Sequence, residues 1–135
     1  MKVLVDTSVW SLALRRRAPA HEAADELRRL IAHGRAGLIG PVRQEILSGV
    51  RDTAGFTRLR DHLRAFPDEA IERADHERAA EHFNTCRNAG VQGSNTDFLI
   101  CAVAERHAMP ILTTDADFTR YASLLPVTLH PCRSS

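Results

Sequence analysis

Four acidic residues spread along the chain have the types and positions needed for metal chemistry: Asp6, Glu45, Asp97 and Asp115. Asp6 follows the apolar run 3–5, and Asp115 follows the run 111–114, so each stands where a short buried strand is expected to end. In a parallel sheet these strand ends meet at one edge, where open α/β sheets bind their ligands. Carboxylates gathered there, with no lysine or histidine between them, favour a hard divalent cation such as Mg²⁺ or Mn²⁺. The pattern points to phosphodiester chemistry.

Each acid also has an ordinary structural role open to it. Asp6 and Asp115 could cap the helices that follow them. Asp97 could complete a capping box with Ser94. Glu45 could be a solvated helix residue, as most glutamates are. For any one of these acids taken singly, the structural role is the better interpretation.

The four acids taken together favour a shared site. Glu45 is expected about one turn into a helix that begins at a strand end, and Asp97 in the first turn of an apolar helix, where the helix dipole tolerates negative charge. Two carboxylates ~4 Å apart repel by about 4 kcal/mol at an effective dielectric of 20. Four gathered carboxylates therefore need protonation or a cation. A Mg²⁺ ion answers this need and keeps several waters, one of which can become a nucleophile.

Short apolar strands alternating with helices predict an α/β domain that spans residues 1–135, with a short parallel sheet covered by helices on both faces. We expect strands at 3–5, 37–40, 111–112 and 127–129. Helical spacing predicts a helix from residue 9 to about 14, one that ends near Gly34, one that begins near Pro41, and four more at 56–66, 74–89, 95–107 and 116–121.

Composition limits the class of protein. A length of 135 residues suits one domain, and 44% hydrophobic with 26% charged residues indicates a globular, soluble chain. No apolar run approaches the ~20 residues of a membrane span, and the N-terminus has no signal-peptide pattern. The three cysteines contain no C-x-x-C pair, which is typical of reduced thiols. We expect a cytoplasmic protein without a membrane partner.

Four motifs make the chain resemble a known family. They are Val-Asp-Thr-Ser-Val-Trp at 5–10, Glu-Ile-Leu at 45–47, Thr-Asp-Phe-Leu-Ile-Cys-Ala-Val-Ala at 96–104 and Thr-Thr-Asp-Ala-Asp-Phe at 113–118. In this order they resemble the PIN-domain family, and specifically the VapC-type toxins of bacterial toxin–antitoxin pairs. The resemblance spans almost the whole chain.

The resemblance implies a metal-dependent endoribonuclease, held inactive by a cognate antitoxin and usually a homodimer. By motif position, the catalytic metal ligands for Mg²⁺ or Mn²⁺ would be Asp6, Glu45, Asp97 and Asp115, with Asp117 as a secondary ligand. Residues expected to support the site are Thr7, Ser8 and Thr114, with Asn95 as a polar residue lining it.

Arginine could hold the phosphates of a nucleic acid. Lys2 is the only lysine, and the guanidinium group suits bidentate phosphate contact. Arg15 and Arg43 lie near expected strand ends and are candidates for binding the RNA substrate. A solvated surface is the alternative for each, and a high-GC genome would also enrich arginine.

Other functions and surfaces stay open. A non-catalytic module that binds DNA and an antitoxin would keep the same fold, and a metal-dependent phosphatase for small molecules would use similar acids. His76-Glu77 begins like a zinc-protease helix, but position 80 lacks the second histidine. The apolar helix faces 27–31 and 56–63 exceed what a narrow sheet needs. One of them is expected to form a homodimer or to receive a helix of the antitoxin.

Overall fold

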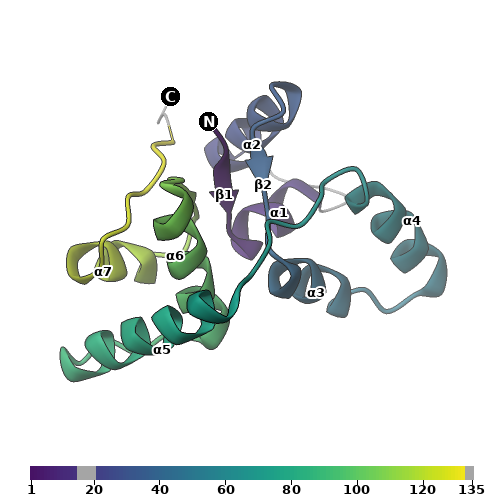
Figure 1. Ribbon diagram of the computed structural model, residues 1–135. Coiled ribbons are helices and arrows are strands. Elements are labelled where there is room, and N and C mark those ends of the chain that lie inside the picture. Colours follow the sequence, from purple (N-terminus) through teal and green to yellow (C-terminus); the bar gives the residue numbers. More distant parts are fainter. Residues whose placement is uncertain (15–20, 133–135) are drawn as a thin grey trace.

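Three short parallel strands form the centre of the molecule. The computed structural model describes residues 1–14 and 21–132. Its strands are β1 (Val3–Val5), β2 (Ala36–Gly37) and β3 (Ile111–Leu112), in the order β2-β1-β3 (Figure 1). In the register, Leu4 pairs with Gly37 on one side of β1 and with Ile111 on the other. Because all three strands are parallel, their carboxyl ends meet at one edge, as the sequence predicts.

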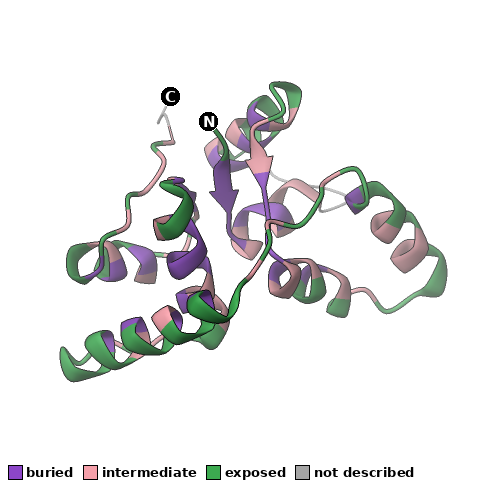
Figure 2. Ribbon diagram, in the orientation of Figure 1, coloured by how far each residue is buried: buried purple, intermediate pink, exposed green. Residues whose placement is uncertain are grey.

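Both faces of the sheet are covered. Successive side chains of a strand point to opposite faces, and Val3, Leu4 and Val5 are all 0% exposed. Figure 2 shows β1 buried over its length between helices. This arrangement confirms the predicted α/β class, with a parallel sheet flanked by helices.

Seven helices surround the sheet in the described part of the chain. Their bounds are α1 Thr7–Leu14, α2 Glu22–Ala32, α3 Gly40–Ser48, α4 Thr53–Leu63, α5 Arg73–Asn88, α6 Asn95–His107 and α7 Asp117–Leu124. Helix α6 has the bounds that its apolar run predicts. Its N-cap Ser94 accepts a hydrogen bond from the backbone N–H of Asp97 at 3.1 Å. Six of its residues are buried, which fixes the helix firmly in the core.

Helix α5 packs along α6 through polar as well as apolar contacts. Asp75, which is 2% exposed, accepts two hydrogen bonds of 2.8 Å from the guanidinium of Arg106. Arg78 donates twice to the Glu105 carboxylate at 3.0 Å, and the ring of the buried His82 lies 2.9 Å from the same carboxylate. These pairs hold the two helices in one relative position.

Two predicted strands and several helix bounds differ from the structure, among them α4, which spans Thr53–Leu63 where 56–66 is predicted, and α7, which continues to Leu124. Pairing at 37–40 is confined to Ala36–Gly37 and one bridge from Leu38 to Asp68, because α3 already begins at Gly40. The predicted strand 127–129 is reduced to a single bridge between Leu129 and Ile111. Helix α1 starts at Thr7, two residues earlier than predicted.

The two apolar helix faces also differ from each other. On α2, Leu27 and Leu30 are 0% exposed and belong to the core, and Ile31 is partly covered. On α4, Leu63 is likewise buried, but Phe56 and Leu59 are both partly exposed. The face of α4 therefore leaves more apolar side chains accessible to a partner.

The described residues contain no helix long and apolar enough to cross a membrane. The three cysteines are free thiols. Cys86 and Cys101 are buried and Cys132 is partly exposed.

Candidate functional site

Asp6 is a buried carboxylate held by hydroxyl groups. It follows β1 directly, and its backbone N–H donates to the carbonyl of Leu112 in the neighbouring strand at 2.9 Å. Asp6 is only 6% exposed, and its Oδ2 accepts hydrogen bonds from the hydroxyl groups of Ser8 at 2.8 Å and Thr113 at 2.9 Å. Burial raises the pKa of Asp6, and the two hydroxyl groups oppose that rise. The sheet thus places at its carboxyl edge a carboxylate whose charge is costly to bury.

Glu45 lies beside this carboxylate on the side of α3. Its Oε1 accepts a hydrogen bond of 2.6 Å from the Thr7 hydroxyl, and Thr7 is next to Asp6 in the chain. Glu45 is solvent-exposed, one turn into the helix, as its position after the strand end predicts. The contact places the Glu45 carboxylate against the residue that follows Asp6.

Asp97 reaches the same region from the first turn of α6. Its Oδ2 accepts a hydrogen bond of 2.8 Å from the hydroxyl of Tyr121 on α7. Burial is the main cause of its raised pKa, the Tyr121 hydroxyl lowers it, and the charge of Asp6 raises it further. Asp6 is therefore close enough to Asp97 for the two charges to affect each other.

Tyr121 is itself enclosed. It is 0% exposed, its ring packs 5.0 Å from those of Phe98 and Phe118, and burial and the hydrogen bond to Asp97 raise its pKa. A Cβ atom at Gly93 would come within 2.2 Å of the Tyr121 hydroxyl. The loop before α6 therefore needs glycine there to leave the hydroxyl in its place.

Asp115 and Asp117 form the third part of the site. The backbone N–H of Asp115 donates to the Thr113 hydroxyl at 3.0 Å, and Asp115 in turn accepts from the backbone N–H of Asp117 at 2.9 Å. The backbone N–H of Thr114 donates to Ser8 at 3.1 Å. Asp115 thus caps α7, the structural role that its sequence position allows, while it stays joined to the hydroxyl network around Asp6.

Two functional residues were not predicted. Thr113 supplies the hydroxyl that binds Asp6, whereas its predicted neighbour Thr114 contributes a backbone N–H. Tyr121 lies outside the four sequence motifs, although the predicted helix 116–121 includes it. Its spacing of three residues from Phe118 on a short helix is the sequence signal that places it on the inner face.

The carboxylates are not balanced by cations. Among the described residues, Arg120 on Asp117, at 3.5 Å, is the only basic side chain paired with any of the five acids. As these side chains are placed, no three His, Cys, Asp or Glu residues of the described chain lie together as a set able to hold a metal ion. The chemistry of the donors nevertheless fits Mg²⁺ or Mn²⁺, because they are carboxylate and hydroxyl oxygens around an uncompensated buried charge.

The two candidate arginines differ. Arg15 lies outside the described residues. The guanidinium of Arg43 donates to Asp68 at 2.8 Å, to the carbonyl of Leu63 at 3.0 Å and to the carbonyl of Phe66. Its donors are thus engaged inside the protein, where they fasten the loop after α4. Asn95 is exposed, in the same helical turn as Asp97.

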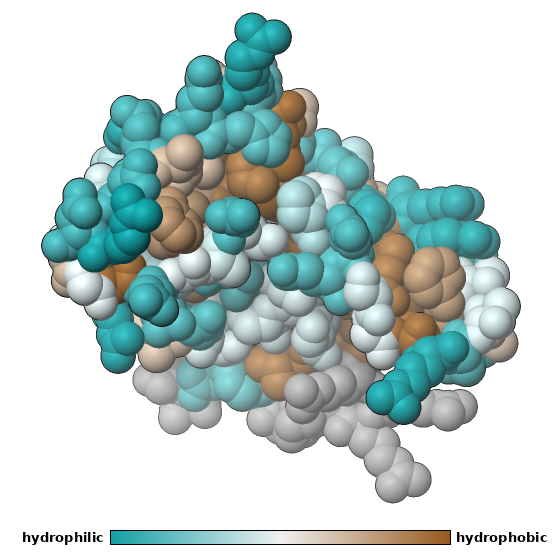
Figure 3. Space-filling view, turned by 90° about the horizontal axis from the view of Figure 1, so that it is seen from below, coloured by the Kyte–Doolittle hydropathy of each residue, from teal (hydrophilic) through white to brown (hydrophobic). Residues whose placement is uncertain are grey.

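The face that carries this edge is mixed. Seen from below the view of Figure 1, hydrophilic and near-neutral residues occupy its middle, and hydrophobic patches lie to either side (Figure 3). Polar groups at the centre with apolar surface around them suit a site that accepts a charged chain.

Comparisons with known proteins agree with this geometry. The family model described as the PIN domain matches residues 3–124. Ribonuclease VapC11 of Mycobacterium tuberculosis and VapC ribonuclease Mb1587 of Mycobacterium bovis are each 37% identical over 120 residues, which is 86% of this chain and 88% of theirs.

Solved structures share the fold at low sequence identity. FitAcB from Neisseria gonorrhoeae superposes with a TM-score of 0.75 at 19% identity and covers 95% of this chain and 96% of its own. VapBC2 from Rickettsia felis, bound to a DNA fragment from its promoter, superposes with a TM-score of 0.73 at 16% identity. The match covers 96% of this chain and 98% of the other. These two likenesses show the fold.

Proposed function

Because the chain belongs to the PIN-domain family and, within it, to the VapC group, we propose that it is a divalent-metal-dependent endoribonuclease that acts as the toxin of a toxin–antitoxin pair. The relatives at 37% identity carry the name ribonuclease. The observation that carries the proposal is the buried Asp6, which has hydroxyl donors, no paired cation among the residues that the structure describes, and a second carboxylate, Asp97, whose charge it affects.

The metal ligands in this proposal are Asp6, Glu45, Asp97 and Asp115, with Asp117 as a secondary ligand. A bound Mg²⁺ or Mn²⁺ would neutralise charge on a substrate phosphate and lower the pKa of a coordinated water. Ser8 and Thr113 fix the orientation of the Asp6 carboxylate, Thr7 fixes Glu45, and Thr114 fixes Ser8 through its backbone N–H. These contacts orient the individual carboxylates, but the acids would have to move closer together to share a cation, since no three of them in the described chain form a set able to hold one.

The substrate would be RNA, entering along the carboxyl edge of the sheet. Arg15 remains a candidate for a phosphate contact. Arg43 would have to exchange its bonds to Asp68 and to the loop carbonyls for such a contact, so we assign it a structural role first.

Partner binding is proposed for the uncovered face of α4. A groove of about 730 Å³ between α1 and α4 combines apolar side chains, among them Leu14, Val50 and Leu59, with the polar side chains of Asp52, Arg58 and His62. An amphipathic helix of an antitoxin would bury this surface, and a second copy of the chain is the alternative occupant. We propose that the protein works in the cytoplasm as a homodimer bound to its antitoxin.

The Asp6→Asn variant tests the activity. With purified protein, RNA and Mn²⁺, the substitution is expected to reduce cleavage at least 100-fold, because it removes the central charge of the site. Stability should not fall, since a neutral amide avoids the burial cost that raises the pKa of Asp6. Cleavage is followed by gel electrophoresis of a labelled RNA and unfolding by circular dichroism.

A matched control is Asp25→Asn, which removes an exposed acid of α2, and should leave cleavage unchanged. Chelator added to the wild-type protein should stop the reaction. An Asp6→Asn protein that cleaves RNA at the wild-type rate, or wild-type cleavage that resists chelator, contradicts the proposal.

A further inference from the structure

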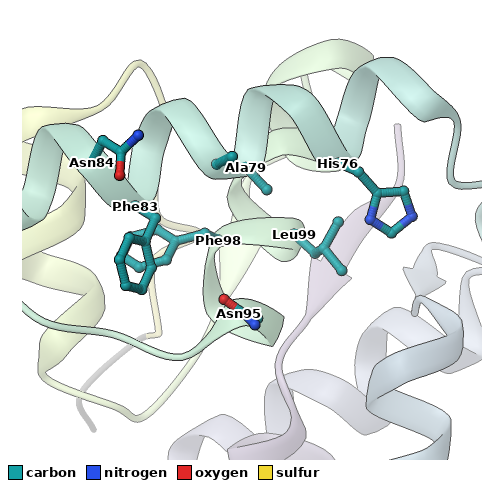
Figure 4. Close-up of a pocket in the computed structure, with 8 residues that line it drawn as sticks. His76, Ala79, Phe83, Asn84, Asn95, Phe98 and Leu99 are labelled. Atoms are coloured by element: carbon teal, nitrogen blue, oxygen red, sulfur yellow. The ribbon is translucent and has the colours of Figure 1, made fainter.

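Two cavities meet at Phe83, between α5 and the start of α6. One, of about 360 Å³, is lined by both helices and includes Phe83, Asn84, Asn95 and Phe98 (Figure 4). The other, of about 300 Å³, includes Phe83, Arg87, Gln92 and Gly93. Each has the size of a small-ligand pocket. Phe83 lines both, so its ring is accessible from two sides.

These cavities adjoin the acidic site. Asn95 stands in the same first turn of α6 as Asp97. The carbonyl of Gln92 lies 3.5 Å from the Tyr121 hydroxyl, and that hydroxyl donates to Asp97 at 2.8 Å. The cavities and Asp97 are thus held by the same first turn of α6 and the loop before it.

Aromatic, cationic and amide groups converge on the cavities. The Phe83 ring is fixed by an edge contact with Phe98 at 5.6 Å, and the Arg87 guanidinium lies over it at 5.6 Å. Arg87 is exposed and has no carboxylate partner among the described residues, but donates to Oδ1 of Asn84 at 3.1 Å. Bound in this way, the amide NH₂ group of Asn84 is still able to donate. In Figure 4 the Phe83 ring lies between the side chains of Asn84 and Asn95.

These are the groups that recognise an unpaired nucleobase. Bases of single-stranded RNA stack on aromatic rings and guanidinium planes and hydrogen-bond through their edges to amides. We propose that the larger cavity, beside Phe83, is a subsite for one nucleobase of the RNA substrate, near the phosphate that is cleaved. The base stacks on the Phe83 ring, and Asn84 and Asn95 bind its edge. Arg87, in the smaller cavity, holds Asn84 and the Phe83 ring from the other side. The subsite rests on the proposed ribonuclease function.

The test uses a short single-stranded RNA oligonucleotide whose cleaved bond has been mapped with the wild-type protein. One abasic residue is then moved along it, position by position. At a position beside the cleaved bond, loss of the base is expected to lower kcat/KM about tenfold or more, since stacking of one base on an aromatic ring is of that strength. Abasic residues at distant positions should have little effect.

Variants test whether the cavities cause this penalty, which is the loss of kcat/KM produced by an abasic residue. In Phe83→Leu and Asn84→Ala the penalty should be smaller than in the wild type, because a group that contacts the base is already missing. Asn84 is exposed, so its variant tests the subsite even where Phe83→Leu is less stable. Asn88→Ala is the matched control, an amide on the same helix that lines neither cavity, and should keep the full penalty.

The same oligonucleotides are also tested for binding to the cleavage-deficient Asp6→Asn protein by fluorescence anisotropy. A penalty of equal size in wild type, Phe83→Leu and Asn84→Ala, or no position-specific penalty at all, overturns the subsite. Absence of cleavage by the wild-type protein overturns the ribonuclease proposal, while the anisotropy measurement still decides whether the cavities bind a base.

Discussion

At the scale of single residues, the site is a set of carboxylates oriented by hydroxyl groups. Asp6 takes its hydrogen bonds from Ser8 and Thr113, and Asp97 takes one from Tyr121. Hydroxyl donors are neutral, so they orient the carboxylates without cancelling their charge. An arginine in the same places would cancel that charge and leave little for a metal ion.

Tyr121 is expected to position Asp97. In Tyr121→Phe the ring keeps its packing against Phe98 and Phe118, but the hydrogen bond to Asp97 is lost. Loss of such an outer contact typically weakens metal binding about tenfold. We expect Mn²⁺ binding, measured by isothermal titration calorimetry, to weaken by that factor.

The control for this prediction is Ser123→Ala, which removes another hydroxyl of α7, one that donates to the carbonyl of Arg120. Its Mn²⁺ affinity should match the wild type. If Tyr121→Phe also binds Mn²⁺ with wild-type affinity, Tyr121 has no positioning role.

The sequence locates the acids better than their partners. Strand ends and helix starts are local signals, so the neighbourhoods of Asp6 and Asp115 follow from the residues around them. The donors Thr113 and Tyr121 depend on how β3 lies beside β1 and how α7 packs on α6, which only the tertiary structure determines. For the same reason, the engagement of Arg43 by Asp68 could not be read from spacing.

At the scale of elements, long helices are predicted well and short strands less well. Helix α6 combines an N-cap with a continuous apolar run, and both signals agree. Residues 127–129 have strand-forming side chains, but Val127 donates its N–H to the carbonyl of Leu125, which turns the chain. Only one bridge to Ile111 then remains.

The pair Asp75–Arg106 should be the strongest single polar link between α5 and α6. Asp75→Ala leaves the guanidinium with only one carboxylate contact, the longer one to Glu72 at 3.6 Å, and also removes the acceptor for the backbone N–H of Glu72. We expect a loss of about 2–3 kcal/mol in the free energy of unfolding, measured by urea denaturation.

Asp25→Ala is the comparison, because Asp25 pairs with Arg28 on the surface, where both side chains are more than half exposed. It should cost less than about 1 kcal/mol. Similar losses for the two variants would show that burial of Asp75 adds nothing to this link.

At the scale of the whole molecule, the segment after α7 runs beside the edge strand β3 and reaches α2 at His130. Ile111 donates to the carbonyl of Thr128 at 2.9 Å and accepts from the N–H of His130 at 2.7 Å. The His130 ring then contacts Glu26, which also receives two hydrogen bonds from Arg29 at 2.6 and 2.7 Å. Glu26 thereby ties the segment to the first half of the chain.

This link should depend on pH. Hydrogen bonds from Arg29, and then from His130, lower the pKa of Glu26 from 4.5 to about 2. A carboxyl with a lowered folded pKa stabilises the protein fully above its unfolded pKa, and the stabilisation is lost as pH falls through the folded value. Glu26→Gln should therefore cost on the order of 1 kcal/mol at neutral pH, and this cost should shrink as pH falls from 4.5 toward 2.

The measurement is urea denaturation of wild type and Glu26→Gln at several pH values, with their difference plotted against pH. Glu81→Gln serves as reference, since Glu81 is largely exposed and its ion pair with Arg78 is long, at 3.5 Å. Its difference should stay near zero throughout. A Glu26→Gln difference that is the same at pH 3 and pH 7 contradicts the assigned pKa.

Because β1 is the central strand, its contacts form only after later parts of the chain have been synthesised. Asp6 leaves the ribosome before β3 does, but its N–H pairs with Leu112 and its carboxylate with Thr113, a residue 107 positions later. A nascent chain that has not yet reached β3 holds neither contact and lacks Asp115 as well. Because domains generally fold as units during synthesis, the proposed site is assembled only when nearly all of the PIN region has been translated.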